Sequence, residues 1–236
     1  MMQLVIGNKN YSSWSFRPWI AMKALGIPFE EVLIPFGTPI GNPEFKQRLA
    51  AYTPVGLVPV LIDGDVHVWE TLAILEYLAE KFPDRHLWPA DAKARAQARA
   101  LASEMHSGFS ALRGECPMNM RRPVRARALP PAAQANVARV EAMWTEARAR
   151  YGGPFLFGNF SAADAMYAPV VARLFTYDIK VNRDALAYME AVMALPAWAE
   201  WKAASLKEEW IVPEDEADWP EVLKEYGGMQ RMPTRS

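Results

Sequence analysis

The stretch "QLVIGNKNYSSWSFRPWIAMKALGIPFEEVLIPF" (residues 3–36) decides how the beginning of the chain folds. It opens with "QLVIG", a short apolar run typical of a buried strand, and closes with "FEEVLIPF", whose alternation predicts a second strand. Between them, residues 14–25 have helical spacing, and Gly26 followed by Pro28 is a common way for a helix to end. The order of strand, helix and strand predicts an α/β unit.

The remainder of the chain divides into two parts with different patterns. "VPVLIDGDVHVWE" predicts a hairpin joined at Asp63 and Gly64, and the leucines of residues 71–82 share one helical face. From residue 92 onward strand patterns vanish, and we expect helices at residues 92–112, 131–151, 161–178, 182–195 and 196–206. The predicted fold class is α+β. An α/β domain over residues 1–83 precedes an all-helical domain over residues 92–236, and "PDRHLWPAD" links them.

Composition excludes some classes of partner. The 236 residues carry 26 Lys and Arg against 27 Asp and Glu, and this near-neutral balance argues against a nucleic-acid-binding protein. We expect the basic run "RRPVRAR" (residues 121–127) to be a solvated loop, and the acidic segment "EEWIVPEDEADWPE" (residues 208–221) to lie on the surface. No apolar run approaches the roughly 20 residues that a bilayer requires, so we expect no membrane segment.

The chain is predicted to be cytoplasmic and to bind no metal. Its beginning, "MMQLVIGNKN", has no basic segment leading into a long apolar core, so no signal peptide is visible. The single cysteine, Cys116, cannot form an internal disulfide, and this fits a reducing compartment. The three histidines lack metal-ligand spacing, and no hydrolase elbow or nucleotide-binding loop occurs.

Small polar residues crowd the start of the first predicted helix, in "NYSSWSFR" (residues 10–17). A helix start offers unpaired N–H groups and the positive end of the helix dipole. A serine hydroxyl at this place either caps the helix or donates a hydrogen bond to a thiolate, which lowers the pKa of the thiol.

Two further signals lie in the same half of the chain. In "GLVPVL", a cis Val58–Pro59 bond would leave the Val58 backbone free to pair with an extended peptide, whereas a trans bond would make Pro59 an ordinary edge residue. In "WETLAILEYL", Glu70 and Thr71 stand where a strand gives way to a helix. Thr71 either simply caps that helix or also meets a carboxylate there, and Glu70 is either solvated or paired with an amine.

Taken in order, these motifs resemble the soluble glutathione transferases. "SSWSFRPWIAMKALGIPFEE" is similar to the opening of zeta-class, serine-type members, "TPVGLVPVL" to the family's cis-proline strand, and "WETLAILEYLAEKFP" to its Glu-Ser helix. "FGNFSAADAMYAPVVARL" resembles the family's capping box, formed by Ser161 and Asp164. The resemblance runs through residue 206. It implies a thioredoxin-like first domain, a helical second domain, glutathione as the cofactor and a homodimer.

The resemblance also implies roles for particular residues. Ser12 would be the catalytic serine that binds the glutathione sulfur, with Ser13 or Ser15 as further donors. The Val58 backbone would pair with the cysteinyl part of glutathione. Three more residues complete the implied glutathione site: Pro59 as the cis-proline, with Glu70 and Thr71 holding the γ-glutamyl group.

Three positions depart from the family's pattern. Trp14 replaces the cysteine of the zeta class, which argues against chemistry that needs that thiol. Leu57 stands where many relatives carry a lysine for the glycyl carboxylate. Thr71 replaces a serine but keeps its hydroxyl.

The second domain is expected to supply the pocket for a small electrophile. His106 and Arg113 are seven residues apart and would share one helical face, where they would bind an acidic substrate or polarise a carbonyl. Surface pairing of Arg113 with Glu104, and packing of His106, is the alternative. We expect Trp210 and Trp219 to pack the tail across this domain. Two functions remain open: conjugation or isomerisation with the glutathione thiolate, or a binding module of the same fold with little activity.

Overall fold

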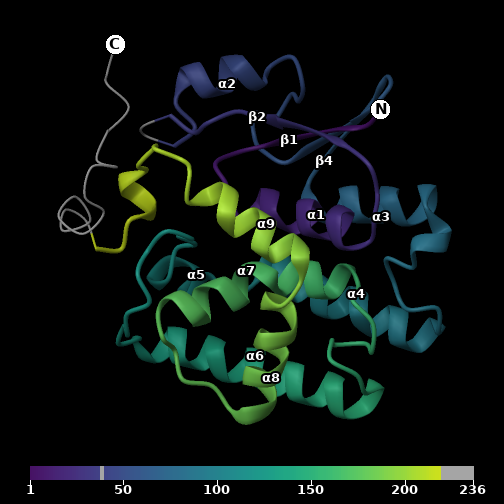
Figure 1. The fold of residues 1–236 in the computed structure, drawn as a ribbon, viewed down its shortest axis with the longest axis vertical. Coiled ribbons are helices and arrows are strands. Elements are labelled where there is room, and N and C mark those ends of the chain that lie inside the picture. The colour runs from purple at the N-terminus through teal and green to yellow at the C-terminus, as the bar shows by residue number, and fades with distance from the viewer. Residues whose placement is uncertain (38–39, 219–236) are drawn as a thin grey trace.

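The computed structural model describes residues 1–37 and 40–218, and within them the predicted strand, helix and strand at the start are confirmed (Figure 1). Strand β1 (Gln3–Ile6) pairs in parallel with β2 (Glu30–Leu33), and α1 (Ser13–Ala24) connects them. The predicted hairpin is also present, as β3 (Val60–Asp63) and β4 (Val66–Trp69). The strand order is β2-β1-β3-β4, with β3 antiparallel to both neighbours.

Two local details differ from the sequence prediction. The hairpin turns at Gly64 and Asp65, because Asp63 still pairs with Val66 in the ladder. Gly64 has a φ of +65°, a conformation that glycine enters without steric cost. Helix α2 (Pro43–Leu49) was not predicted, since a seven-residue helix that buries only two side chains carries too little periodicity to recognise.

The two faces of the sheet bury different partners. Along β1, Val5 packs with Phe45 and Leu49 of α2, while Leu4 and Ile6 belong to the larger core on the opposite face. This alternation follows from the two-residue period of a strand. Figure 1 shows α1 and α3 (Thr71–Lys81) on that opposite face, between the sheet and the helical half of the molecule.

The helical half has the predicted succession of helices with one break. Its elements, after the 3-10 turn η1 (Pro83–Arg85), are α4 (Ala92–Ser107), α5 (Ser110–Glu115), α6 (Pro131–Tyr151), α7 (Ala162–Thr176), α8 (Arg183–Met193) and α9 (Pro196–Ser205). The helix expected over residues 92–112 is interrupted at Gly108 and Phe109, and Phe109 has a φ of +59°. A Cβ on Gly108 would lie 2.7 Å from the Glu104 carbonyl oxygen, so this break suits glycine.

Helix α7 is the centre of the molecule and packs against both α1 and α4. The predicted capping box is present at its start: the Asp164 carboxylate accepts hydrogen bonds from Ser161 N at 2.8 Å and from Leu156 N at 3.0 Å. Because α7 is surrounded by protein, this box satisfies N–H groups that no water would reach. No helix of the described ranges is long and apolar enough to cross a membrane.

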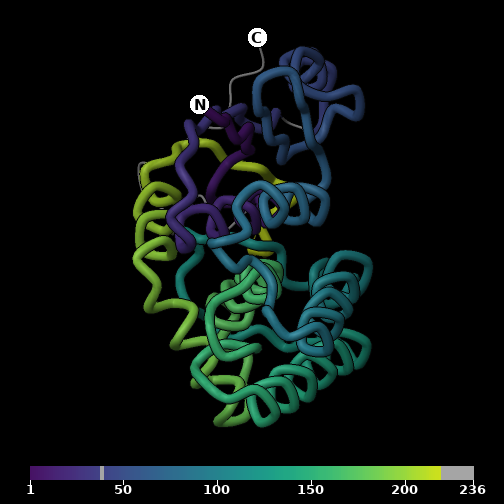
Figure 2. Tube along the Cα trace, turned by 90° about the vertical axis from the view of Figure 1, so that its right-hand side faces the viewer, coloured from purple at the N-terminus to yellow at the C-terminus, as the bar shows by residue number. Residues whose placement is uncertain are grey.

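The segment after α9 follows the sequence prediction only in part. Residues 207–218, with the 3-10 turn η2 (Pro213–Asp215), run back from the helical half to the sheet half (Figures 1 and 2). Trp210 is only half-buried and bonds through its carbonyl group, and Trp219 lies outside the described residues. The segment does reach the helical domain, but through hydrogen bonds with Asn119 and Arg121, and the Trp210 ring is not among the described side chains that pack against the core. The carboxylates of the segment also bind the loop before α1.

The basic run (residues 121–127) and the acidic segment (residues 208–221) were both expected on the surface, yet each contains buried charged side chains. Arg121 and Arg122 are 8% and 4% exposed, and Glu208 and Glu216 are 7% and 6% exposed, so neither run is simply a solvated surface. These groups are buried because each one hydrogen-bonds to a segment far away in the chain.

Candidate active site

Two adjoining cavities lie where the sheet half meets the helical half. The first, which we call the Glu70 cavity, has a volume of about 340 Å³ and is lined by Trp14, Val55, Leu57, Val58, Pro59, Trp69, Glu70, Thr71, His106 and Arg113. The second, the Ser12 cavity, has about 290 Å³, and its lining includes Tyr11, Ser12, Ser13, Met118, Arg173 and Asp215. Trp14, Leu57, Val58 and Arg113 line both cavities. The eight predicted site residues therefore surround one continuous cleft.

Ser12 caps the start of α1. Its Oγ accepts a hydrogen bond from Ser15 N at 3.3 Å and donates one to Ser15 Oγ at 2.7 Å. Ser15 is fully buried, takes a further bond from Gly7 N at 3.1 Å, and lines neither cavity. Ser15 is thus placed to support Ser12 and not to touch a ligand, whereas Ser13 faces the Ser12 cavity.

Val58 and Pro59 form a cis peptide bond, which is the alternative that the sequence left open. Pro59 is buried at the entry to β3, while Val58 is half-buried and lines both cavities. The neighbouring Leu57 side chain is 56% exposed and offers no cation to this wall of the cleft.

Glu70 and Thr71 occupy the junction of β4 and α3. Glu70 has φ +69° and ψ +126°, a region that only glycine enters freely, and its carboxylate lies 3.9 Å from His106 Nε2. Thr71 is the first residue of α3 and does not cap it, since its hydroxyl donates to the Trp14 carbonyl at 3.3 Å. The Glu70 side chain is 54% exposed to solvent and lines the Glu70 cavity.

His106 and Arg113 face the Glu70 cavity from two different helices. The break at Gly108 separates α4 from α5, so the predicted shared helical face is wrong, although the turn still brings both side chains to one cavity. Glu104 makes two bonds with Arg139, at 2.8 and 2.9 Å, and does not pair with Arg113.

Two guanidinium groups lie close to the Trp14 ring. Arg17 lies 4.1 Å and Arg113 4.9 Å from the ring centroid, while the His106 ring approaches it at 5.2 Å in an edge contact. Arg17 is completely buried, and its terminal nitrogens have no acceptor within residues 1–37 and 40–218. Burial, together with the charges of Arg173 and Arg113, holds the pKa of Arg17 well below its ordinary value.

Sequence reasoning missed Arg173 and Asp215 in the Ser12 cavity. Arg173 bonds the Cys116 carbonyl at 2.8 Å, and burial lowers its pKa to about 10, which leaves it charged at neutral pH. An arginine inside the otherwise apolar "YAPVVARLF" was a usable signal for it. Burial raises the pKa of Asp215 to about 6, against the opposing attraction of Arg173. The local pattern around Asp215 carried no such signal.

Cys116 has no catalytic environment. It is fully buried, and desolvation raises the pKa of its thiol to about 11. Within the described part of the chain, no group of three or more His, Cys, Asp or Glu side chains is arranged to hold a metal ion.

Known proteins share this sequence and fold. Residues 11–81 match the family described as glutathione S-transferase, N-terminal domain, and residues 124–204 match glutathione S-transferase, C-terminal domain. A zeta-class glutathione S-transferase of Euphorbia esula is 32% identical over 108 residues, which are 46% of this chain and 47% of that protein. A maleylpyruvate isomerase of a Ralstonia species is 35% identical over 99 residues, 40% of this chain and 45% of that protein. The chain thus spans about half the length, or less, of the curated relatives it matches.

Solved structures agree on the fold along nearly the whole chain. A glutathione transferase homologue from Burkholderia with bound glutathione superposes with a TM-score of 0.66 at 24% identity, covering 88% of this chain and 99% of that one. A bacterial maleylpyruvate isomerase of the zeta class gives 0.64 at 24% identity, covering 86% and 97%. Because both family domains match in order and together cover more than half of the sequence, the chain belongs to the glutathione S-transferase superfamily.

Proposed function

We propose that this protein is an enzyme that uses the thiolate of glutathione to attack small electrophiles, by conjugation or by isomerisation. The observation that carries the proposal is the continuous cleft, which is lined by Ser12 at the start of α1 and by Val58, Glu70 and Thr71. The family of the chain and the glutathione-bound relative support glutathione as the ligand.

Glutathione would extend along the two cavities. In the Glu70 cavity, the Glu70 carboxylate pairs with the γ-glutamyl amine, and the Thr71 N–H at the start of α3 donates to the γ-glutamyl carboxylate. The Val58 backbone pairs with the cysteinyl unit, which directs the sulfur toward Ser12 in the second cavity. The Ser12 hydroxyl turns from Ser15 to the sulfur and donates to it, aided by the positive end of the α1 dipole.

The hydroxyl stabilises the thiolate once the thiol has released its proton to solvent, and the thiolate then supplies the electron pair for a new carbon–sulfur bond. In a conjugation by substitution, the leaving group departs with the electron pair of the bond that breaks. In a conjugation by ring opening or by addition to a double bond, that electron pair stays on an atom of the substrate, which then takes up a proton. In an isomerisation, the adduct rotates about the bond that has become single, and expulsion of the thiolate restores the double bond.

The Ser12 cavity favours an electrophile that carries a carboxylate or a carbonyl group. Arg113 and Arg173 reach it from α5 and α7, and Asp215 is the single acidic side chain among its lining residues in the described ranges. An arginine that is partly desolvated binds an anion more strongly than an exposed one. His106 faces the neighbouring cavity, beside Glu70, and is placed to assist the same ligand.

The test compares Ser12→Ala with Ser13→Ala by following the ultraviolet absorbance of the bound thiolate against pH. We expect Ser12→Ala to raise the pKa of the bound thiol by about one to two units, the equivalent of one charge-assisted hydrogen bond. Ser13→Ala should change it less. If only Ser13→Ala shifts the curve, Ser13 and not Ser12 is the serine that binds the thiolate. If neither variant does, the proposed thiolate site is wrong.

The alternative function is a binding module of the same fold with little catalytic activity. Retention on immobilised glutathione together with turnover of an aromatic halide, an epoxide or a maleyl-type acid supports the enzyme. Retention without turnover across that panel would favour the module. A homodimer, as the family resemblance implies, is tested separately by sedimentation at micromolar concentration, where a monomer mass would remove it.

A further inference from the structure

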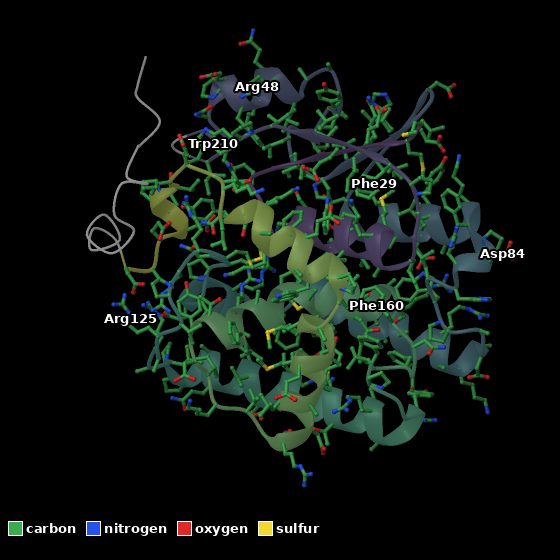
Figure 3. All side chains as sticks on the ribbon, viewed as in Figure 1. Phe29, Arg48, Asp84, Arg125, Phe160 and Trp210 are labelled. Carbon is green, nitrogen blue, oxygen red and sulfur yellow. The ribbon has the colours of Figure 1, made fainter. Side chains whose placement is uncertain are left out.

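The loop that carries the serine is held by a segment from the other end of the chain. Residues 207–218, which we call the strap, leave α9 and cross to the loop of residues 8–12 (Figure 1). Figure 3 shows Trp210 on this segment, on the side of the molecule where the sheet lies. We propose that Glu208 and Glu216 of the strap are positioning residues for Ser12, an inference that rests on the proposed role of Ser12 in binding the thiolate.

Glu208 binds the backbone of the loop directly. Its two carboxylate oxygens accept from consecutive N–H groups, Lys9 N at 2.7 Å and Asn10 N at 3.0 Å, and the side chain is buried. A carboxylate has two oxygens free of protons, so it accepts both bonds at once, whereas an amide in its place turns a donor toward one of the N–H groups. The conformation of the loop is therefore matched to an acidic side chain.

Glu216 holds the residue that immediately precedes Ser12. One of its oxygens accepts from the Tyr11 hydroxyl at 2.6 Å, and the other accepts from Asn119 Nδ2 at 2.7 Å. Burial and the nearby Glu216 charge raise the pKa of Tyr11, so this phenol keeps its proton and remains a donor to the strap. The Tyr11 hydroxyl thus supports the serine loop, and the hydrogen bond to the thiolate is assigned to Ser12.

Arg121 ties the strap and the loop to the helical half. Its guanidinium donates to the Glu208 carbonyl, to the Trp210 carbonyl at 2.6 Å and to the Tyr11 hydroxyl at 2.8 Å. Its own N–H donates to Asn10 Oδ1 at 2.8 Å. Loop, strap and the turn after α5 therefore form one buried hydrogen-bonded unit.

This unit determines where the Ser12 hydroxyl lies relative to a bound sulfur. Ser12 is the last residue of the loop and the N-cap residue of α1, so a shift of the loop moves its Oγ. Hydrogen-bond strength falls steeply with distance and angle, so a displacement of roughly 1 Å removes most of the thiolate stabilisation. Glutathione binding depends mainly on Val58, Glu70 and Thr71, which the strap does not bond.

The experiment uses the full chain with Glu208→Gln, Glu216→Gln and Tyr11→Phe. Asp218→Asn is the matched control, because Asp218 is a strap carboxylate that bonds Arg122 at 2.6 Å and Arg125 at 2.9 Å, not residues 8–12. Three quantities are measured: the pKa of the bound glutathione thiol from its ultraviolet absorbance, the Kd of glutathione, and hydrogen exchange of the loop amides. Tyr11→Phe is included because it deletes a single hydroxyl and leaves both strap carboxylates in place.

We expect the three variants to raise the pKa of the bound thiol by about one unit, with a Kd within about twofold of wild type and faster exchange in the loop. Asp218→Asn should match wild type in all three. If Ser12→Ala raises that pKa and the strap variants do not, the positioning role is wrong and the proposed function stands. If Ser12→Ala does not change the pKa of the bound thiol, the proposed role of Ser12 is itself wrong. If the strap variants leave the hydrogen exchange of the loop amides unchanged, the strap does not order the loop, whatever the role of Ser12.

Discussion

Ser12 and Glu70 face one cleft from opposite ends, and they are held in place by different kinds of contact. The Ser12 loop is buried and donates hydrogen bonds to Glu208, 199 positions after Lys9 in the chain. Glu70 is set by the junction of β4 and α3, its helix start has no side-chain cap bond, and its carboxylate is about half exposed. The end that would stabilise the thiolate is thus buried and held by distant segments, while the residue that would bind the γ-glutamyl amine is about half exposed and positioned by its own strand–helix junction.

The largest expected effect is at the open end. Glu70→Gly should raise the Kd of glutathione roughly tenfold to hundredfold, because a charged hydrogen-bonding partner is lost. The same change should raise the free energy of unfolding by about 1 kcal/mol, because glycine adopts a φ of +69° without strain. Calorimetric titration and urea denaturation measure the two quantities.

Glu70→Ala is the matched control for that prediction, since it loses the carboxylate but keeps the strained backbone. It should weaken binding equally and gain no stability. Equal stability of the glycine and alanine variants would contradict the view that Glu70 is held in an unfavourable conformation for its function.

A smaller effect is expected at Arg113, which lines both cavities and so joins the two ends. Arg113→Gln should lower kcat/KM for a carboxylate-bearing electrophile about tenfold and leave a neutral one nearly unchanged, since one charge-assisted contact is removed. Arg99→Gln is the control, because Arg99 pairs with Glu76 away from the cleft. An equal loss of kcat/KM with both electrophiles would mean that Arg113 shapes the cavity but does not bind the carboxylate.

The smallest effect concerns pH at the Ser12 end. Asp215 has a pKa raised to about 6 by burial, so it is mostly ionised at pH 7 and offsets the charge of Arg173. As the pH falls from 7 to 5 it takes up a proton, the cavity becomes more positive, and inhibition by a carboxylate that stays ionised should strengthen about threefold. Asp215→Asn should bind that inhibitor more tightly at pH 7 and lose most of this dependence. A dependence that persists in the variant would assign it to another group.

What the sequence by itself determined was largely local. The strand, helix and strand at the start and the hairpin follow from periodicity and turn residues, which act within a few positions. The Ser161–Asp164 box, which the family resemblance implied, is likewise a contact between neighbours in the chain. The order of these motifs resembles that of the glutathione transferases, and this resemblance pointed to Ser12, Val58 and Glu70, which the structure places around one cleft.

Only the tertiary structure decided the rest. Arg121 and Glu208 read as solvated charges in the sequence and are buried in the structure, since each finds its partners on segments that are neighbours only after folding. Arg173 and Asp215 meet in the Ser12 cavity for the same reason. A charged side chain is buried only where other groups satisfy it, and those groups were too far away in the chain for any local pattern to reveal.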